Sequence, residues 1–212
     1  MASLKDIRLR IDSTKNTQQI TRAMKLVSAA KLRRAQHNIT NMRPYALTLK
    51  KVIANITATQ NVTHPLMAQP QAGDKATTEQ TKKVLLVVLT SDRGLCGGFN
   101  TNIIKFADRY RLENASKVGK LDFLFIGKRG DDYFAKRGIK SIETIFKLDK
   151  DISYDLAKGV AEKLIKHYLS GGYDEIRLVY NEFKSAISQM VVCETLLPIQ
   201  IEVGSLLKGK IF

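Results

Sequence analysis

Apolar residues between residues 3 and 57 recur in alternating steps of three and four, the spacing of a helix that forms a coiled coil. The stretch has no Gly and consists mainly of good helix formers, so it predicts one helix, about 80 Å long. The predicted seam covers about eight heptads and needs a partner helix. The polar seam positions from Thr14 to Ser28 would fix the register of the two helices. Its positions are Leu4, Ile7, Ile11, Thr14, Gln18, Thr21, Lys25, Ser28, Leu32, Ala35, Ile39, Met42, Ala46, Leu49, Ile53 and Ile56.

The middle of this predicted helix is apolar on every side. Its apolar residues are Ile20, Ala23, Met24, Leu26, Val27, Ala29, Ala30 and Leu32. A helix with that pattern is typically enclosed by other protein, and the alternative is a solvated amphipathic helix in an ordinary bundle. Pro44 either kinks the helix or ends it. The same spacing resumes from Tyr45 to Ile56, which favours a kink.

The rest of the chain alternates predicted strands and helices. Residues 58–82, rich in Thr, Gln and Asn, predict a linker, and residues 83–90 predict a fully buried strand. The elements expected next are a helix to residue 113, a strand at 121–126, a helix at 130–136, a weaker strand at 139–145, a helix at 151–169, and strands at 175–180 and 190–196. Alternation of this kind predicts a mainly parallel sheet with right-handed crossovers. The last strand follows a short connection, so it is expected to run antiparallel at an edge.

The predicted fold class is therefore α/β: a long N-terminal coiled-coil helix plus a small Rossmann-like, mainly parallel sheet domain. The expected organisation is a long helix at 1–57, a linker at 58–82, an α/β domain at 83–198 and a C-terminal tail at 199–212. No stretch approaches the run of about 18 to 20 apolar residues that would span a bilayer.

Positive charge is concentrated in the predicted helix. The chain carries a formal net charge of +15, and residues 1–57 hold twelve Lys and Arg against only Asp6 and Asp12. A basic row runs beside the seam through Arg8, Lys15, Arg22, Arg43 and Lys50. An acidic partner is expected, and nucleic acid, anionic lipid and an acidic protein surface all satisfy this charge.

The turn after the first strand, Ser91–Asn100, is the place where a Rossmann-type domain would hold a phosphate. The glycines Gly94, Gly97 and Gly98 do not satisfy G-x-G-x-x-G, and the chain contains no G-x-x-x-x-G-K-[ST]. Residues 127–130, at the end of the second strand, lack the acid that binds a ribose. We therefore expect neither nucleotide nor another cofactor in this domain.

Cys96 stands close to a predicted helix N-terminus, where a cysteine can act as a nucleophile. A phosphatase loop would need an Arg at the position of Asn102, and no base is identifiable, so Cys96 is expected to pack within the turn. Asp92 and Arg93 are candidates for an ion pair or a cap that shapes the turn. Cys193 is too distant in sequence to indicate a disulfide framework or a zinc site, so no metal is expected.

Four segments closely resemble the γ subunit of F-type ATP synthases: Asn16–Arg34, Arg43–Ala46, Thr90–Asn100 and Ile187–Pro198. The resemblance implies the central rotor shaft of a proton-translocating enzyme, without catalytic residues of its own. In that family two long helices form an antiparallel coiled coil inside a ring of α and β subunits. The α/β domain lies at the foot, bears the ε subunit and rests on the membrane c-ring, while nucleotide chemistry belongs to β.

The resemblance also implies which residues contact the ring. Six basic residues would meet acidic lever segments of β, and three apolar residues would lie in the enclosing sleeve. The basic residues are Arg8, Lys15, Arg22, Lys25, Arg33 and Arg34, and the apolar ones are Ile20, Met24 and Val27. The shaft turns with the c-ring and drives the β subunits through their conformational cycle.

The sequence stops at Phe212, before the family's second long helix, so a truncated or processed product, or an unusual variant of the family, is expected. The lack of a presequence favours the inner face of a bacterial plasma membrane, with membrane contact only through the complex. A mature organellar protein is the alternative.

Two rival functions follow from the same features. A basic helix that runs into heptads is typical of leucine-zipper proteins that bind nucleic acid. Here, however, the basic residues spread along the whole helix, and its middle is too apolar for a major groove. The second rival, a small nucleotide-dependent enzyme, would require the nucleotide motifs that the sequence lacks.

Overall fold

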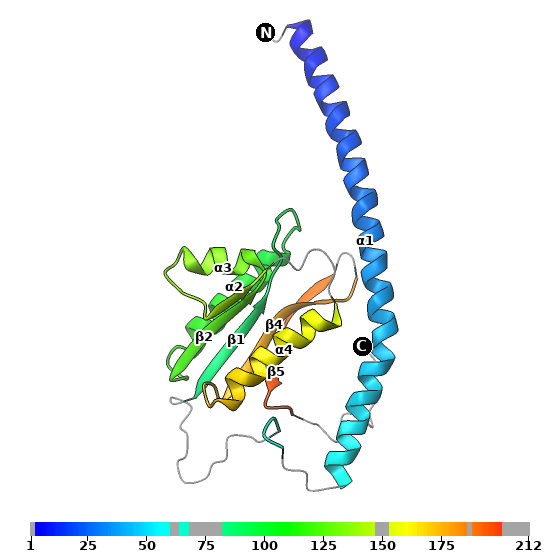
Figure 1. Cartoon of the computed structure of the whole chain (residues 1–212). Coiled ribbons are helices and arrows are strands. Elements are labelled where there is room, and N and C mark those ends of the chain that lie inside the picture. Colours follow the sequence, from blue (N-terminus) through cyan, green and yellow to red (C-terminus); the bar gives the residue numbers. More distant parts are fainter. Residues whose placement is uncertain (1–2, 60–63, 68–81, 147–152, 186–187, 201–212) are drawn as a thin grey trace. The chain divides into compact units, whose positions relative to one another are not determined.

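The computed structural model describes residues 3–59, 64–67, 82–146, 153–185 and 188–200 (Figure 1). The chain divides into two units. One contains the N-terminal helix and the other contains the sheet, and each is described by itself.

The N-terminal helix α1 spans Leu4–Thr59, 56 residues without interruption, so the predicted single long helix is confirmed. At about 1.5 Å per residue it measures about 84 Å. Ser3 begins it in a reciprocal arrangement: the Lys5 backbone N–H donates to Ser3 Oγ at 3.4 Å, and the Ser3 N–H donates to Asp6 Oδ2 at 3.2 Å. Pro44 lies inside the helix and does not end it.

The second unit contains a five-stranded sheet in the order β3-β2-β1-β4-β5. Its strands are β1 (Lys83–Leu89), β2 (Lys120–Ile126), β3 (Glu143–Ile145), β4 (Glu175–Phe183) and β5 (Gln189–Leu197). The first four run parallel, and β5 pairs antiparallel with β4 at the edge. The predicted mainly parallel sheet with an antiparallel edge strand is therefore confirmed.

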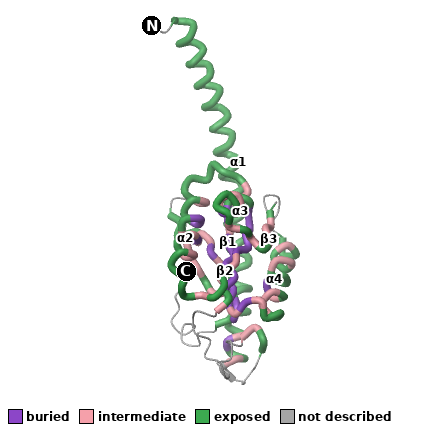
Figure 2. The backbone as a smooth tube through the Cα atoms, turned by 90° about the vertical axis from the view of Figure 1, so that its left-hand side faces the viewer, coloured by how far each residue is buried: buried purple, intermediate pink, exposed green. Residues whose placement is uncertain are grey.

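Helices cover both faces of the sheet, as the alternating pattern predicted. The helices α2 (Phe99–Asn114) and α3 (Lys128–Ala135) pack on one face, and α4 (Tyr154–Leu169) packs on the other. Each face of the sheet carries a hydrophobic core, and alternate residues of β1 point into the two cores. Leu86 and Val88 pack with α2 and α3, and Leu85 and Val87 pack with α4. Because β1 is central, Val84–Val88 is buried on both faces, and Figure 2 shows the buried backbone gathered in the sheet.

Some predicted boundaries differ from the structure. The strand expected at 139–145 shrinks to Glu143–Ile145, because the chain first turns through Gly138 and places Ile139 against the core of α2 and α3. Helix α3 begins two residues earlier than expected, directly after Gly127. Helix α4 begins at Tyr154, where Ser153 Oγ accepts a hydrogen bond from the Leu156 N–H at 3.2 Å.

Two other sequence assignments reach beyond what the structure describes. Helix α1 continues to Thr59, so it includes the first two residues of the segment assigned as a linker. Most of that segment, and the tail from residue 201, lie outside the described residues. Within the described part of the chain, no helix combines the length and apolar character needed to cross a bilayer.

Gly127 is a position where only glycine fits. Its φ is 102°, and a Cβ atom there would lie 2.1 Å from the Thr90 carbonyl oxygen. Gly127→Ala is therefore expected to lower the free energy of unfolding by at least about 2 kcal/mol, measured by urea denaturation. Gly159→Ala is the control, because Gly159 lies in α4 with open space around it. That control should keep or raise stability, and equal losses in both variants would contradict the steric explanation.

Candidate functional site

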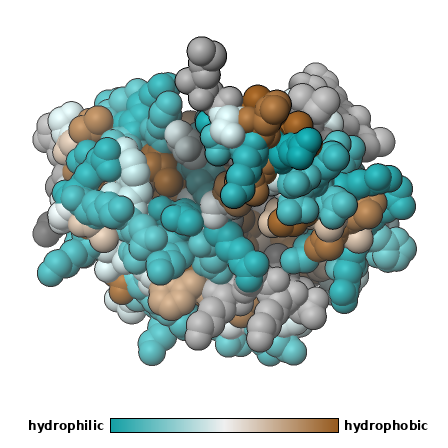
Figure 3. Space-filling view, turned by 90° about the horizontal axis from the view of Figure 1, so that it is seen from above, coloured by the Kyte–Doolittle hydropathy of each residue, from teal (hydrophilic) through white to brown (hydrophobic). Residues whose placement is uncertain are grey.

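The surface of α1 is the first candidate for a functional site. Every residue from Ser3 to Val52 is exposed, and Figure 2 shows the N-terminal part of α1 in the exposed colour. The exposed large apolar residues include Leu4, Ile7, Leu9, Ile11, Ile20, Met24, Leu26, Val27, Ile39, Met42 and Leu49. A space-filling view shows hydrophobic patches at the surface among hydrophilic residues (Figure 3). Apolar surface of this extent is typical of a protein interface.

The residues predicted to contact a ring are all exposed on α1. At about 100° per residue, Arg8, Lys15, Arg22 and Arg33 fall within about 40° of one another, and we call them the basic stripe. The apolar residues Ile20, Met24 and Val27 are each more than half exposed and form a second line, which we call the apolar stripe.

The two stripes lie about 150° apart around the helix, and the middle of the predicted seam, from Thr14 to Leu32, lies on the longer arc of about 210° between them. The helix therefore has three different sides. Lys25 belongs to the seam rather than to the basic stripe, and Arg34 lies beside the apolar stripe. The structure thus groups seven of the nine predicted contact residues into the two stripes and separates Lys25 and Arg34 from their basic neighbours.

The polar part of the seam and the positions beside it carry several threonine hydroxyl groups. The hydroxyl groups of Thr14, Thr17 and Thr21 donate to backbone carbonyls four residues earlier, at 2.8–2.9 Å. These donors are therefore satisfied within the helix. A shallow hollow follows the same stretch, lined by Ser13, Thr14, Thr17, Gln18, Thr21, Arg22 and Lys25. This part of the seam offers a partner helix little apolar area.

The turn after β1 is held in shape by one amide side chain. Asn100 Oδ1 accepts from the Ser91 backbone N–H at 2.9 Å, and Asn100 Nδ2 donates to Ser91 Oγ, the Arg93 carbonyl and Cys96 Sγ at 2.9, 3.2 and 3.1 Å. Cys96 is exposed and contacts only Ser91 and Asn100 among the side-chain hydrogen bonds described for it. Neither neighbour is a base that could activate a thiol, so the geometry supports a role in the turn.

The same turn is fastened to the start of α3. Asp92 Oδ1 accepts from the Lys128 backbone N–H at 2.9 Å, so Asp92 caps this helix from a distant part of the chain. Buried Thr90 accepts from the Gly130 N–H at 2.9 Å. Of the two alternatives expected for Asp92, an ion pair or a cap, this contact is a cap, and it lies at the start of α3.

Leu95, at the tip of this turn, was missed by the sequence analysis. Its side chain is fully exposed and its backbone is left-handed, with a φ of 61°. Both features are unfavourable for a leucine, and strained positions are enriched at functional sites. The available signal was a large apolar residue within a Gly-rich turn, where nothing local can bury it.

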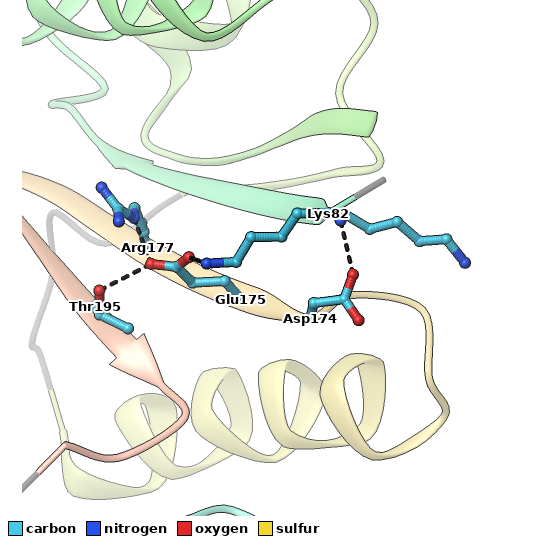
Figure 4. A network of polar contacts seen from close by, with 6 residues as sticks. Lys82, Asp174, Glu175, Arg177 and Thr195 are labelled. Carbon is cyan, nitrogen blue, oxygen red and sulfur yellow. Dashed lines mark hydrogen bonds and ion pairs between the residues drawn. The ribbon is translucent and has the colours of Figure 1, made fainter. Parts of the chain in front are cut away.

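A buried ionic cluster joins the ends of three strands in the sheet unit (Figure 4). The Glu175 carboxylate, 4% exposed, forms an ion pair with Lys82 and accepts from Arg177 Nε at 2.5 Å and from Thr195 Oγ1 at 2.9 Å. Arg177 also lies over the Tyr110 ring, 5.6 Å from its centroid. Burial alone would raise the pKa of Glu175, but the hydrogen bonds from Lys82 and Arg177 outweigh it and lower that pKa.

The fold is similar to the solved central stalk and c-ring structure of the Tetrahymena thermophila mitochondrial ATP synthase, with a TM-score of 0.61, 30% identity, and coverage of 84% of this chain and 72% of that chain. It is also similar to the rotor of the Euglena gracilis mitochondrial enzyme, with a TM-score of 0.55, 20% identity, and coverage of 95% and 64%. At that identity the second likeness shows the fold alone.

Sequence comparison gives the family. The ATP synthase family model matches residues 3–209. The ATP synthase gamma chain of Bdellovibrio bacteriovorus is 64% identical over 95% of this chain, and that of Geotalea uraniireducens is 44% identical over 97%. The chain therefore belongs to the ATP synthase gamma chain family. It spans 65% of the length of the Bdellovibrio relative and 68% of the Geotalea relative.

Leu95 gives a test of backbone strain. Leu95→Gly removes the cost of a left-handed leucine, which exceeds the added chain entropy of glycine, so the free energy of unfolding should stay equal or rise by about 1 kcal/mol. Leu95→Ala retains the left-handed cost and should leave stability nearly unchanged. Thermal denaturation of both variants measures this, and a loss in the glycine variant alone would contradict the strain.

Glu175 gives a test by pH. Its lowered pKa means that folding is stabilised while the carboxylate is charged, so the contribution is present above the ordinary glutamate pKa and is lost as the pH falls through the lowered value. Between about pH 6 and about pH 3 the wild type should lose more free energy of unfolding than Glu175→Gln. Glu182→Gln, on the same strand, is the control and should follow the wild type. Parallel curves for all three proteins would rule out the ionic contribution.

Proposed function

We propose that this chain is the central rotor-shaft subunit of an F-type proton-translocating ATP synthase and that it couples c-ring rotation to conformational cycling of the catalytic β subunits. One observation carries the proposal: an uninterrupted helix of 56 residues presents apolar and basic stripes with no cover from the described residues. Membership in the gamma chain family supports an ATP synthase as the assembly that supplies that cover.

The angular separation of the stripes supplies the coupling mechanism. A shaft can favour one β conformation over another only if its interaction free energy with the two conformations differs. Because the basic and apolar stripes lie on different sides of α1, each β subunit meets a charged side and then an apolar side as the shaft turns. At any one moment the shaft presents a different side to each of the three β subunits.

The basic stripe suits the acidic lever segments expected on β. Exposed ion pairs contribute only about 0–1 kcal/mol each, so such contacts can form and break as the shaft turns. A fully buried pair would cost several kcal/mol to break and would act as a brake. The exposure of Arg8, Lys15, Arg22 and Arg33 along the helix is in keeping with shallow contacts.

In this proposal nucleotide chemistry takes place on β, and the present chain has no catalytic residue, cofactor or metal of its own. Among the described residues, no cluster of three or more metal-ligating side chains occurs. The proposed partners are α, β, ε and the c-ring. The proposed organisation is a shaft helix at 1–57, which the structure extends to Thr59, a linker at 58–82, an α/β domain at 83–198 and a tail at 199–212.

The proposed location is the inner face of a bacterial plasma membrane, with membrane contact only through the complex. The bacterial gamma chains among the relatives support it. The likeness to a mitochondrial central stalk and c-ring structure supports c-ring contact through the same fold.

Affinity capture of the tagged full chain from its source cell tests the assignment. We expect α, β and ε to co-purify. Lys15→Glu together with Arg22→Glu should reduce recovery of β about tenfold, because reversed charges oppose an acidic surface.

Lys158→Glu together with Lys166→Glu is the matched control, because both lysines are exposed on α4. This control should retain β. Equal loss in both double variants, or capture of nucleic acid with a steep salt dependence instead of these subunits, would contradict the proposal.

A further inference from the structure

The ionic cluster around Glu175 occupies a particular place in the sheet. Glu175 begins β4, the strand between β1 and β5. Its register partner on β1 is Val84, two residues after Lys82, and the adjacent Ile176 is paired with Leu197, the last residue of β5. The chain therefore enters β1 and leaves β5 at the same end of the sheet, on either side of Glu175.

The backbone ladder is weakest where the cluster lies. Between β4 and β5 the register shifts between Ile176 and Arg177, whose partners are Leu197 and Thr195, so Leu196 is the extra residue of a bulge. Thr195, directly before the bulge, is the residue whose hydroxyl donates to Glu175. Side-chain bonds thus reinforce the strand pair at the position where the ladder is interrupted.

The opposite side of β4 is fastened in a similar way. Lys82 pairs with Glu175, and beside it the Lys83 N–H donates to Asp174 Oδ2 at 2.8 Å while the Asp174 N–H donates to the Lys83 carbonyl at 2.8 Å (Figure 4). Arg177, held over Tyr110, connects the cluster to α2. One carboxylate therefore joins the segment before β1 to β4 and β5.

We propose that Glu175 is a positioning residue that fastens the start of β1 and the end of β5 to β4, so that the two points where the chain enters and leaves the sheet move as one body. A force that separates residues 82 and 197 would unzip the ladders from this end, one hydrogen bond at a time, instead of shearing them together. The contacts at this end of the sheet then determine the force needed to separate the strands. Glu175 supplies such contacts on both sides of β4. That rotation of the shaft applies such a force rests on the proposed function, whereas the fastening of β1 and β5 to β4 does not.

Hydrogen exchange of the full chain, followed by mass spectrometry, tests the fastening. Glu175→Gln should speed exchange about tenfold in residues 192–197 and in residues 82–84, because an amide cannot hold Lys82 and Arg177 as a carboxylate does. Exchange in Phe123–Ile126 of β2 should change much less. Glu182→Gln is the matched control, since Glu182 pairs with Lys184 two residues later, as Glu175 pairs with Arg177.

Thr195→Val keeps the carboxylate and removes only one hydroxyl, so it preserves the test if Glu175→Gln fails to fold. It should speed exchange in residues 192–197 and leave residues 82–84 unchanged. Faster exchange in β2 and β5 alike in either variant, or no change in β5, would overturn the proposal. Hydrogen exchange of this chain needs no partner. Failure to capture α and β would therefore refute the rotor assignment and leave the proposal about Glu175 unaffected.

Discussion

A lone helix cannot cover its own apolar surface, and this constraint governs the whole molecule. Helix α1 exposes large apolar side chains from Leu4 to Ile56, at fractions that would be unfavourable in a free soluble helix of this length. Propensity favours a helix here, but most helical stability in proteins comes from packing of an apolar face, and the described residues leave this face exposed from Ser3 to Val52. The proposed rotor function would supply that packing, with the seam and the two stripes facing different neighbours.

The sheet unit has the opposite character. It buries β1 on both faces and builds two cores of its own, with Phe123, Phe125 and Phe134 stacked on one side and Leu164 closing the other. Within the described residues it requires no other chain to complete these cores. Among the described residues, the molecule thus combines a unit with buried cores of its own and a helix exposed from Ser3 to Val52. This contrast is in keeping with the proposed rotor-shaft function.

Local pattern made much of the fold predictable. The run Val84–Val88 can only be a strand buried on both faces, and the short connection before β5 allows only an antiparallel return. The heptad spacing likewise predicted α1 and the positions of its charged and apolar side chains. Element boundaries were less accurate, since the length of β3 depends on where Gly138 lets the chain turn.

The features that escaped prediction depend on contacts between distant residues. Nothing near Glu175 in the sequence indicates that Lys82 and Thr195 will meet it, because strand order decides which residues become neighbours. The strain at Leu95 was equally unpredictable from the sequence. Its left-handed backbone lies in a turn that the hydrogen bonds of Asn100 hold together. The family resemblance identified this turn as significant without indicating which side chain it exposes.

Pro44 has a consequence for the mechanics of the long helix. A proline has no backbone N–H, so the hydrogen bond that would join residue 44 to the Thr40 carbonyl is absent from an otherwise continuous helix. The bending stiffness of α1 is therefore lower at this one turn than along the residues before it. A change of helix direction is therefore easier at this turn than along residues 4–40.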